Sequence, residues 1–139
     1  MIARACAVWV ALLALAFANG ALRELAIIPQ LGDGAGHALS SILLSSAMFL
    51  LAWLTIDWIH PASIGEAWQI GGVWLVMTVA FEFLAGHYLF GNPWSQLLAD
   101  YNVLRGRIWV LVLATTLMAP VITARITVPL RTWKSATGD

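Results

Sequence analysis

Four long apolar segments constrain this chain more than any other feature of its sequence. A helix needs about 20 mostly apolar residues to cross the hydrocarbon core of a bilayer. Four stretches of the 139-residue chain meet that requirement, at about residues 2–28, 38–58, 64–90 and 104–130. The chain is 61% hydrophobic and 10% charged, which is too apolar for a soluble domain. The sequence therefore predicts an all-α integral membrane four-helix bundle, formed by a single domain over residues 1–139.

The predicted ends of these segments follow from local signals. Pro29 is expected to stop the first helix, and the Gly-rich stretch QLGDGAG after it is typical of a loop. Ser63-Ile64-Gly65-Glu66 fits a capping box that would start the third helix near Ile64. Pro120 lies inside the fourth segment, where it should kink the helix because it removes a backbone hydrogen bond.

The N-terminal segment has a second interpretation. MIARACAVWVALLALAFANG combines a positive start, an apolar core and Ala16-Phe17-Ala18, which resembles a signal-peptidase site. Cleavage after Ala18 would leave three spans. We favour a retained first helix because the apolar pattern continues beyond this site to Ile28.

Charge and cysteine content exclude several classes of function. The formal net charge is zero and basic residues do not cluster, so we expect no nucleic-acid partner. The single cysteine, Cys6, excludes a disulfide within the chain. Orientation follows from basic residues near the two chain ends, which the positive-inside rule places in the cytoplasm of a bacterial inner membrane: Arg4, Arg125, Arg131 and Lys134.

Small and weakly polar residues form a stripe on each of three predicted helices, with the three-and-four spacing of one helix face. Such stripes favour close helix packing in membranes, and a polar conduit lined by hydroxyls is the alternative. The stripes are Ser41, Ser45, Met48, Ala52 and Thr55; Gly71, Leu75, Thr78, Glu82 and Gly86; and Arg105, Trp109, Val112, Thr116, Pro120, Thr123 and Thr127.

The topology predicts a polar cluster on one side of the membrane, because the first and third helices end there and the fourth begins there. Charges inside a bilayer usually face the bundle and pair with one another. Glu82 should pair with Arg23, or failing that with Arg105, and Glu24 with Arg105 or Arg107. The candidate site residues are Asn19, Arg23, Glu24, Glu82, His87, Asp100, Tyr101, Asn102, Arg105 and Arg107.

A short amphipathic helix is predicted between the third and fourth spans. Asn92 precedes Pro93 at the expected helix start. The apolar residues that follow have the i, i+3, i+4, i+7 spacing of one face: Trp94, Leu97, Leu98 and Tyr101. This helix should lie in the membrane interface or fold over the mouth of the bundle as a lid.

The cluster indicates binding or transport of an anionic amphiphile or small molecule. Arginine guanidinium groups would hold the carboxylate or phosphate, and Glu82 and His87 would exchange protons. The alternative is a structural accessory or scaffold subunit whose charges pair only with one another. A second alternative is a membrane enzyme acting on a lipid-like substrate, without assigned catalytic residues. Partners would be the bilayer, an anionic lipid, a second copy of the chain or a larger membrane complex.

Cofactor binding has weaker support. Haem ligation would require His37 and His87 to face each other at equal depth. A metal site from Glu82, His87 and Asp100 does not match a known ligand spacing, so we predict neither a cofactor nor a metal.

Three sequence elements, Asn19-x-x-x-Arg23-Glu24, Phe81-Glu82-Phe83-x-x-Gly86 and Asp100-Tyr101-Asn102-x-x-x-Gly106-Arg107, occur together. In this combination the chain resembles a group of small four-helix bacterial membrane proteins of unknown function. The resemblance extends over nearly the whole chain and implies no activity.

Overall fold

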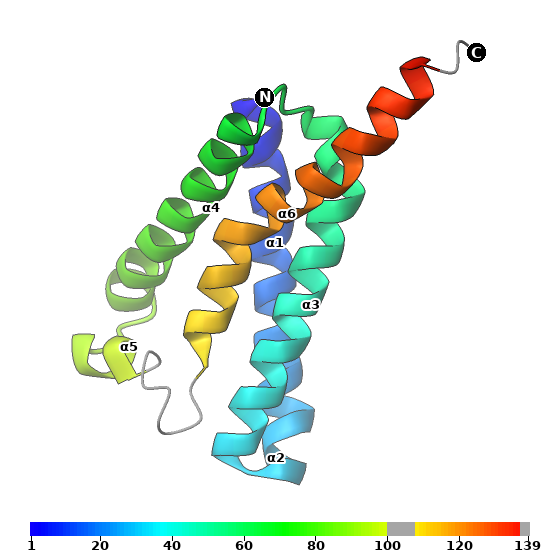
Figure 1. Cartoon of the computed structure of the whole chain (residues 1–139). Coiled ribbons are helices and arrows are strands. Elements are labelled where there is room, and N and C mark those ends of the chain that lie inside the picture. Colours follow the sequence, from blue (N-terminus) through cyan, green and yellow to red (C-terminus); the bar gives the residue numbers. More distant parts are fainter. Residues whose placement is uncertain (100–107, 137–139) are drawn as a thin grey trace.

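A computed structural model of the chain describes residues 1–99 and 108–136, and of 128–136 only the backbone. The regular structure in these two ranges is entirely helical (Figure 1), which confirms the all-α class. Four helical runs in the described part are long and apolar enough to cross a membrane: Ile2–Leu31, Asp33–Ile59, Ile64–Leu89 and Trp109–Thr127.

The sequence predicted that the first run would stop at Pro29, but the run continues past this residue. It consists of α1 (Ile2–Leu22), the π-helical turn η1 (Arg23–Ile27) and α2 (Ile28–Leu31). A proline ring in a helix clashes with the carbonyl four residues earlier, which here belongs to Leu25. Leu25 lies inside η1, whose wider turn accommodates the clash, so the helix continues past the proline.

The Gly-rich stretch is also not the loop that was predicted. Gly32, with φ of +84°, separates α2 from α3 (Asp33–Ile59). This left-handed backbone conformation suits glycine because it has no Cβ. A second glycine permits the tight reversal, since a Cβ at Gly36 would lie 2.8 Å from the Cγ1 atom of Ile28. The helix therefore begins earlier than the expected Ala38.

The capping box of the third run is confirmed. Helix α4 (Ile64–Leu84) begins after Ser63, whose hydroxyl accepts a hydrogen bond from the Glu66 backbone N–H at 3.2 Å. The Glu66 carboxylate accepts in turn from the Ala62 N–H at 2.6 Å. A second π-helical turn, η2 (Ala85–Leu89), extends α4 at its far end.

The short helix α5 (Trp94–Ala99) and the long helix α6 (Trp109–Ala136) complete the described chain. Helix α5 begins one residue later than predicted, because the Pro93 carbonyl accepts its first hydrogen bonds, from Gln96 and Leu97. Figure 1 shows α6 bending in its orange section, around residues 115–125, where Pro120 lies.

The long helices pack in a ring, with α6 against α3 and α4, and α1 against the other sides of α3 and α4. The start of α1 and the end of α6 lie at one end of the molecule, and α2 and α5 lie at the other (Figure 1). We call the end that holds the start of α1 the terminal half, and the end that holds α2 and α5 the cavity half. At the crossing of α4 and α6, a Cβ at Gly71 would overlap the backbone carbonyl oxygen of Leu117, so these two helices touch through their backbones.

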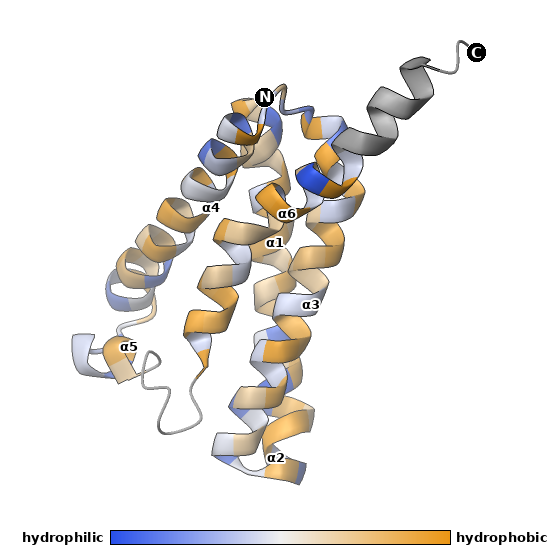
Figure 2. Ribbon diagram, viewed as in Figure 1, coloured by the Kyte–Doolittle hydropathy of each residue, from blue (hydrophilic) through white to orange (hydrophobic). Residues whose placement is uncertain are grey.

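Apolar residues predominate along the long helices (Figure 2), and many of them are exposed. Leu25, Leu54 and Leu89 are 81%, 71% and 77% exposed, as suits residues that face lipid rather than water. Helix α1 contributes Ala5, Val8 and Leu12 to the buried core.

Candidate functional site

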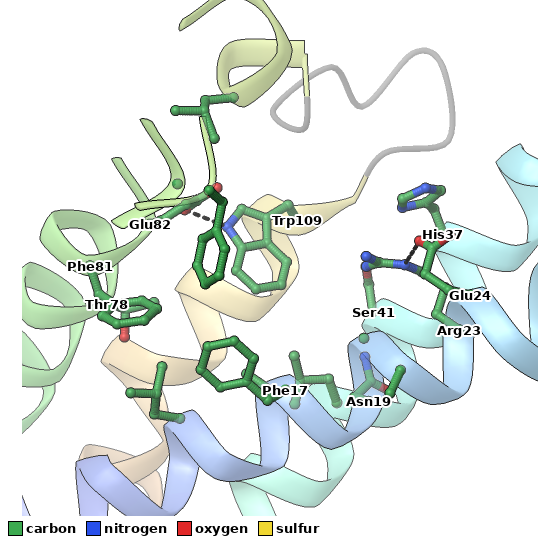
Figure 3. Close-up of a pocket in the computed structure, with 18 of the residues that line it drawn as sticks. Phe17, Asn19, Arg23, Glu24, His37, Ser41, Thr78, Phe81, Glu82 and Trp109 are labelled. Atoms are coloured by element: carbon green, nitrogen blue, oxygen red, sulfur yellow. Dashed lines mark hydrogen bonds and ion pairs between the residues drawn. The ribbon is translucent and has the colours of Figure 1, made fainter. Parts of the chain in front are cut away.

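A cavity of about 540 Å³ opens between the long helices in the cavity half (Figure 3). Its described lining comes from α1, η1, α3, α4, η2, α5 and α6. Small-molecule sites usually enclose about 300 to 1,000 Å³. The structure brings four of the candidate site residues to this cavity: Asn19, Arg23, Glu24 and Glu82.

The sequence predicted that Glu82 would pair with Arg23, but the structure does not show this pair. Its Oε2 atom accepts a hydrogen bond from the indole Nε1–H of Trp109 at 2.8 Å (Figure 3). Trp109 lies at the start of α6, so the bond joins two helices beside the cavity. An indole N–H is a neutral donor. Its hydrogen bond stabilises the half-buried carboxylate.

Arg23 pairs instead with its neighbour in the chain. Its Nε atom lies 3.2 Å from Glu24 Oε1, and the Arg23 and Glu24 side chains are 25% and 61% exposed. No described residue accepts a hydrogen bond from the two terminal nitrogens of Arg23. Figure 3 shows this end of the guanidinium pointing into the open space toward Trp109, with Glu24 on its other side. The cavity thus receives hydrogen-bond donors that carry positive charge.

Polar contacts between α1 and α3 hold the same wall of the cavity. Asn19 Nδ2 donates to Ser40 Oγ at 2.7 Å, deep enough that Ser40 is fully buried. His37 Nε2 lies 3.3 Å from Asp33 Oδ1, one turn earlier on α3. His37 and Ser41 both line the cavity next to Arg23. The wall between α1 and α3 is therefore its polar side.

His87 is placed differently from the prediction that it would join this cluster. Its ring stacks on Trp94 with centroids 3.9 Å apart, and Nδ1 lies 2.9 Å from the Asn92 backbone oxygen. It is not among the described residues that line the cavity, whereas His37 is. Haem ligation by this pair, which the sequence did not favour, would require the His87 ring to leave Trp94.

The opposite wall of the cavity is aromatic. Phe17 from α1 lies edge-on to Phe81 of α4, with ring centroids 5.9 Å apart, and to Phe90 at 6.4 Å. Trp9 adds a further edge contact to Phe81 at 6.2 Å. All three phenylalanines line the cavity. The cavity is therefore amphipathic, with a polar wall at Arg23 and an apolar wall at Phe17.

Both π-helical turns adjoin this cavity. Arg23 opens η1, and Gly86 in η2 also lines the cavity. A Cβ at Gly86 would lie 2.8 Å from a terminal methyl of Leu97, so the missing side chain lets α5 pack closely against η2. Single π-helical turns in longer helices often occur at functional sites. Their placement here gives a backbone reason to regard this cavity as the site.

The remaining candidate residues lie outside the described residues: Asp100, Tyr101, Asn102, Arg105 and Arg107. Pairing of Glu82 with Arg105 stays a prediction, as does the extension of the short helix to Tyr101. Glu24 pairs with Arg23 among the described residues, and its predicted pairing with Arg105 or Arg107 stays a prediction.

The buried hydroxyls of the α6 stripe are satisfied within their own helix, and the conduit stays a prediction. Thr116, Thr123 and Thr127 are buried, and each donates to the carbonyl four residues earlier in its own helix, at 2.7, 2.7 and 2.9 Å. Ser41 and Thr78, from the other two stripes, line the cavity. The stripe of α6 therefore supports the bent helix around Pro120.

Sequence reasoning missed Trp109, His37 and the phenylalanine wall. Trp109 was placed on a stripe without a role, because only ionisable residues were treated as site candidates. An indole N–H on the stripe facing Glu82 was the available signal. No group of three or more His, Cys, Asp or Glu residues in the described ranges could hold a metal ion.

Comparison of the chain with protein-family profiles, with curated proteins and with solved structures gave no match. The chemistry of the cavity therefore has to be inferred from its side chains. The resemblance to small bacterial membrane proteins stays a prediction.

Proposed function

We propose that the cavity binds the anionic group of a membrane amphiphile or small molecule. The observation that carries this proposal is the guanidinium of Arg23, which presents two terminal nitrogens without a described protein acceptor to a cavity of about 540 Å³. Guanidinium groups match phosphate and carboxylate because their paired N–H donors contact two oxygens at once. Apolar surroundings strengthen such contacts.

The carboxylate of Glu82 is compatible with an anion in the same cavity. The Trp109 indole donates to it and so stabilises its negative charge. Arg23 and Glu82 come from opposite sides of the cavity in Figure 3. The anionic group would bind near Arg23, and Glu82 would meet a neutral or donor part of the same ligand.

A scaffold role is the competing proposal, and a specific observation favours it. Arg23 has Glu24 as a partner, and Glu82 has Trp109. Charges that satisfy one another can fix the register of helices without any ligand. A scaffold should tolerate Arg23→Met combined with Glu82→Leu. A ligand site would lose binding in that variant even where the protein remains folded.

Titration of the purified protein with dodecyl phosphate tests the binding proposal. Arg23→Gln should weaken binding by about tenfold to a hundredfold, since a hydrogen bond to a charged group contributes about 1.5–3 kcal/mol. Arg4→Gln is the matched control. Arg4 belongs to the same helix but lies in the terminal half, where its Nη1 donates to the Trp58 carbonyl at 2.8 Å. Equal affinities for wild type and Arg23→Gln would overturn the proposal.

We also propose a location and orientation. The basic residues Arg4 and Arg125 favour a cytoplasmic terminal half in a bacterial inner membrane, which would place the cavity near the opposite leaflet. Reporter fusions at the C-terminus would decide between the two orientations.

A further inference from the structure

The contact between α1 and α4 changes character along its length. In the terminal half, two tryptophans bridge these helices. Trp74 Nε1 donates to the Ala5 carbonyl at 2.8 Å, and Trp9 Nε1 donates to Thr78 Oγ1 at 3.0 Å. Beyond Thr78 the described side chains form no further hydrogen bond between α1 and α4. The contact there is made by the rings of Phe17, Phe81 and Phe90, which can rotate without breaking a hydrogen bond.

An apolar hollow lies on the other side of these rings, on the outer face of α4 and η2. It is lined by Ala80, Phe81, Leu84, Ala85, Tyr88 and Leu89. Phe81 lines both the hollow and the cavity. Leu84 and Leu89 are 57% and 77% exposed. In a membrane this hollow therefore faces lipid chains.

The depths of these groups match those of an amphiphile. The run Ile2–Leu31 has 30 residues and is about 45 Å long, against about 30 Å of bilayer hydrocarbon. If the helix is centred, Arg23 lies about 5 Å inside the hydrocarbon edge, within reach of a head group. Phe17 lies about 9 Å deeper along the same helix. A ligand with its anion at Arg23 would have its next atoms beside the phenylalanine wall.

We infer that the ligand is an amphiphile whose hydrocarbon chain leaves the cavity sideways, past Phe81, between α1 and α4 into the bilayer. This inference rests on the proposed function and adds the ligand class and its route. The chain would occupy the hollow on α4 and make apolar contacts there. Helix α5 contacts the cavity through Leu97, which does not line the hollow.

A series of alkyl phosphates tests the route, because the head group stays constant while the chain grows. Dodecyl phosphate should bind at least about tenfold tighter than butyl phosphate, since each buried methylene adds to the affinity. Inorganic phosphate should bind most weakly. Equal affinity for butyl and dodecyl phosphate would overturn the route and leave the head-group proposal intact. Equal affinities of the wild type and Arg23→Gln for dodecyl phosphate would instead overturn the head-group proposal.

A matched pair of variants locates the chain. Ala80 lines the hollow and faces outward, and Val76 lies one turn earlier on the same face of α4, outside the hollow, at 67% exposure. Ala80→Trp should fill the hollow, so dodecyl phosphate loses about tenfold in affinity while butyl phosphate keeps its own. Val76→Trp adds the same bulk to the lipid face and should leave both affinities unchanged. Unchanged dodecyl phosphate affinity in Ala80→Trp would contradict the route.

A photoreactive group in the middle of a dodecyl phosphate chain gives a readout independent of affinity. Cross-links that excess unlabelled dodecyl phosphate suppresses should map to peptides around Phe17 and Phe81. Suppressible cross-links confined to α5 would overturn the lateral route.

Discussion

The terminal half and the cavity half of this protein use the same kinds of residue for different purposes. In the terminal half, Gly71 brings α4 against the backbone of α6, and Trp74 ties α4 to α1. In the cavity half, Figure 1 shows α4 diverging from α1, and the space between the helices becomes a cavity. Tight packing at one end thus holds the helices that open at the other.

Polar side chains show the same contrast. The buried hydroxyls of Thr116 and Thr123 in α6 donate within their own helix. By contrast, Arg23, Glu82 and Trp109 direct polar atoms to the cavity or across it. A polar side chain in a membrane helix is therefore informative about ligand binding when it lines a cavity, and much less so when its own backbone satisfies it.

Gly71→Ala should have the largest effect on stability, because it disrupts the crossing of α4 and α6. The new Cβ would overlap the Leu117 carbonyl oxygen, and a backbone atom cannot move aside as a side chain can. We expect a loss of about 3 kcal/mol or more in unfolding free energy, measured by reversible unfolding in detergent. Gly72→Ala is the control, since a Cβ there meets nothing within 4 Å. Equal stability of the two variants would refute the close contact between α4 and α6 in the terminal half.

Trp74→Phe tests whether stability and binding belong to separate halves. The substitution removes the hydrogen bond from the buried indole to the Ala5 carbonyl. Unfolding free energy should fall by about 1 kcal/mol. Affinity for dodecyl phosphate should remain within about twofold, because Trp74 does not line the cavity. A large loss of affinity without loss of stability would show that the halves are coupled.

Ser45→Ala should have the smallest effect. The Ser45 hydroxyl is buried in α3, and no described residue forms a hydrogen bond with it. Removing an unsatisfied polar group should leave stability unchanged within about 0.5 kcal/mol or raise it. The same unfolding assay measures this change. A marked destabilisation would mean that the Ser45 hydroxyl has a hydrogen-bond partner in the membrane. The tightly packed part of the molecule would then contain functional polar groups.

Several features of the fold were predictable because their causes are local. The apolar segments have the length that a bilayer demands, and Ser63 with Glu66 forms the cap that its spacing indicated. Placing Asn19 and Glu82 at one cavity followed from helix rise and the direction of the chain, which need no knowledge of side-chain contacts.

Other features depended on competition between local effects. The continuation past Pro29 required a π-helical turn, and sequence periodicity does not reveal one in advance. The pair of Arg23 with Glu24 was missed because consecutive residues in a regular α-helix point in different directions. The role of Trp109 was missed because a neutral indole was not counted as a partner for a carboxylate.

Native mass spectrometry of the protein purified in mild detergent tests the central claim most directly. We predict that the wild-type protein retains an anionic amphiphile, that Arg4→Gln retains it equally, and that Arg23→Gln loses it while remaining folded. Absence of any bound amphiphile from wild type, with no binding of added dodecyl phosphate, would contradict the ligand site and leave the scaffold role.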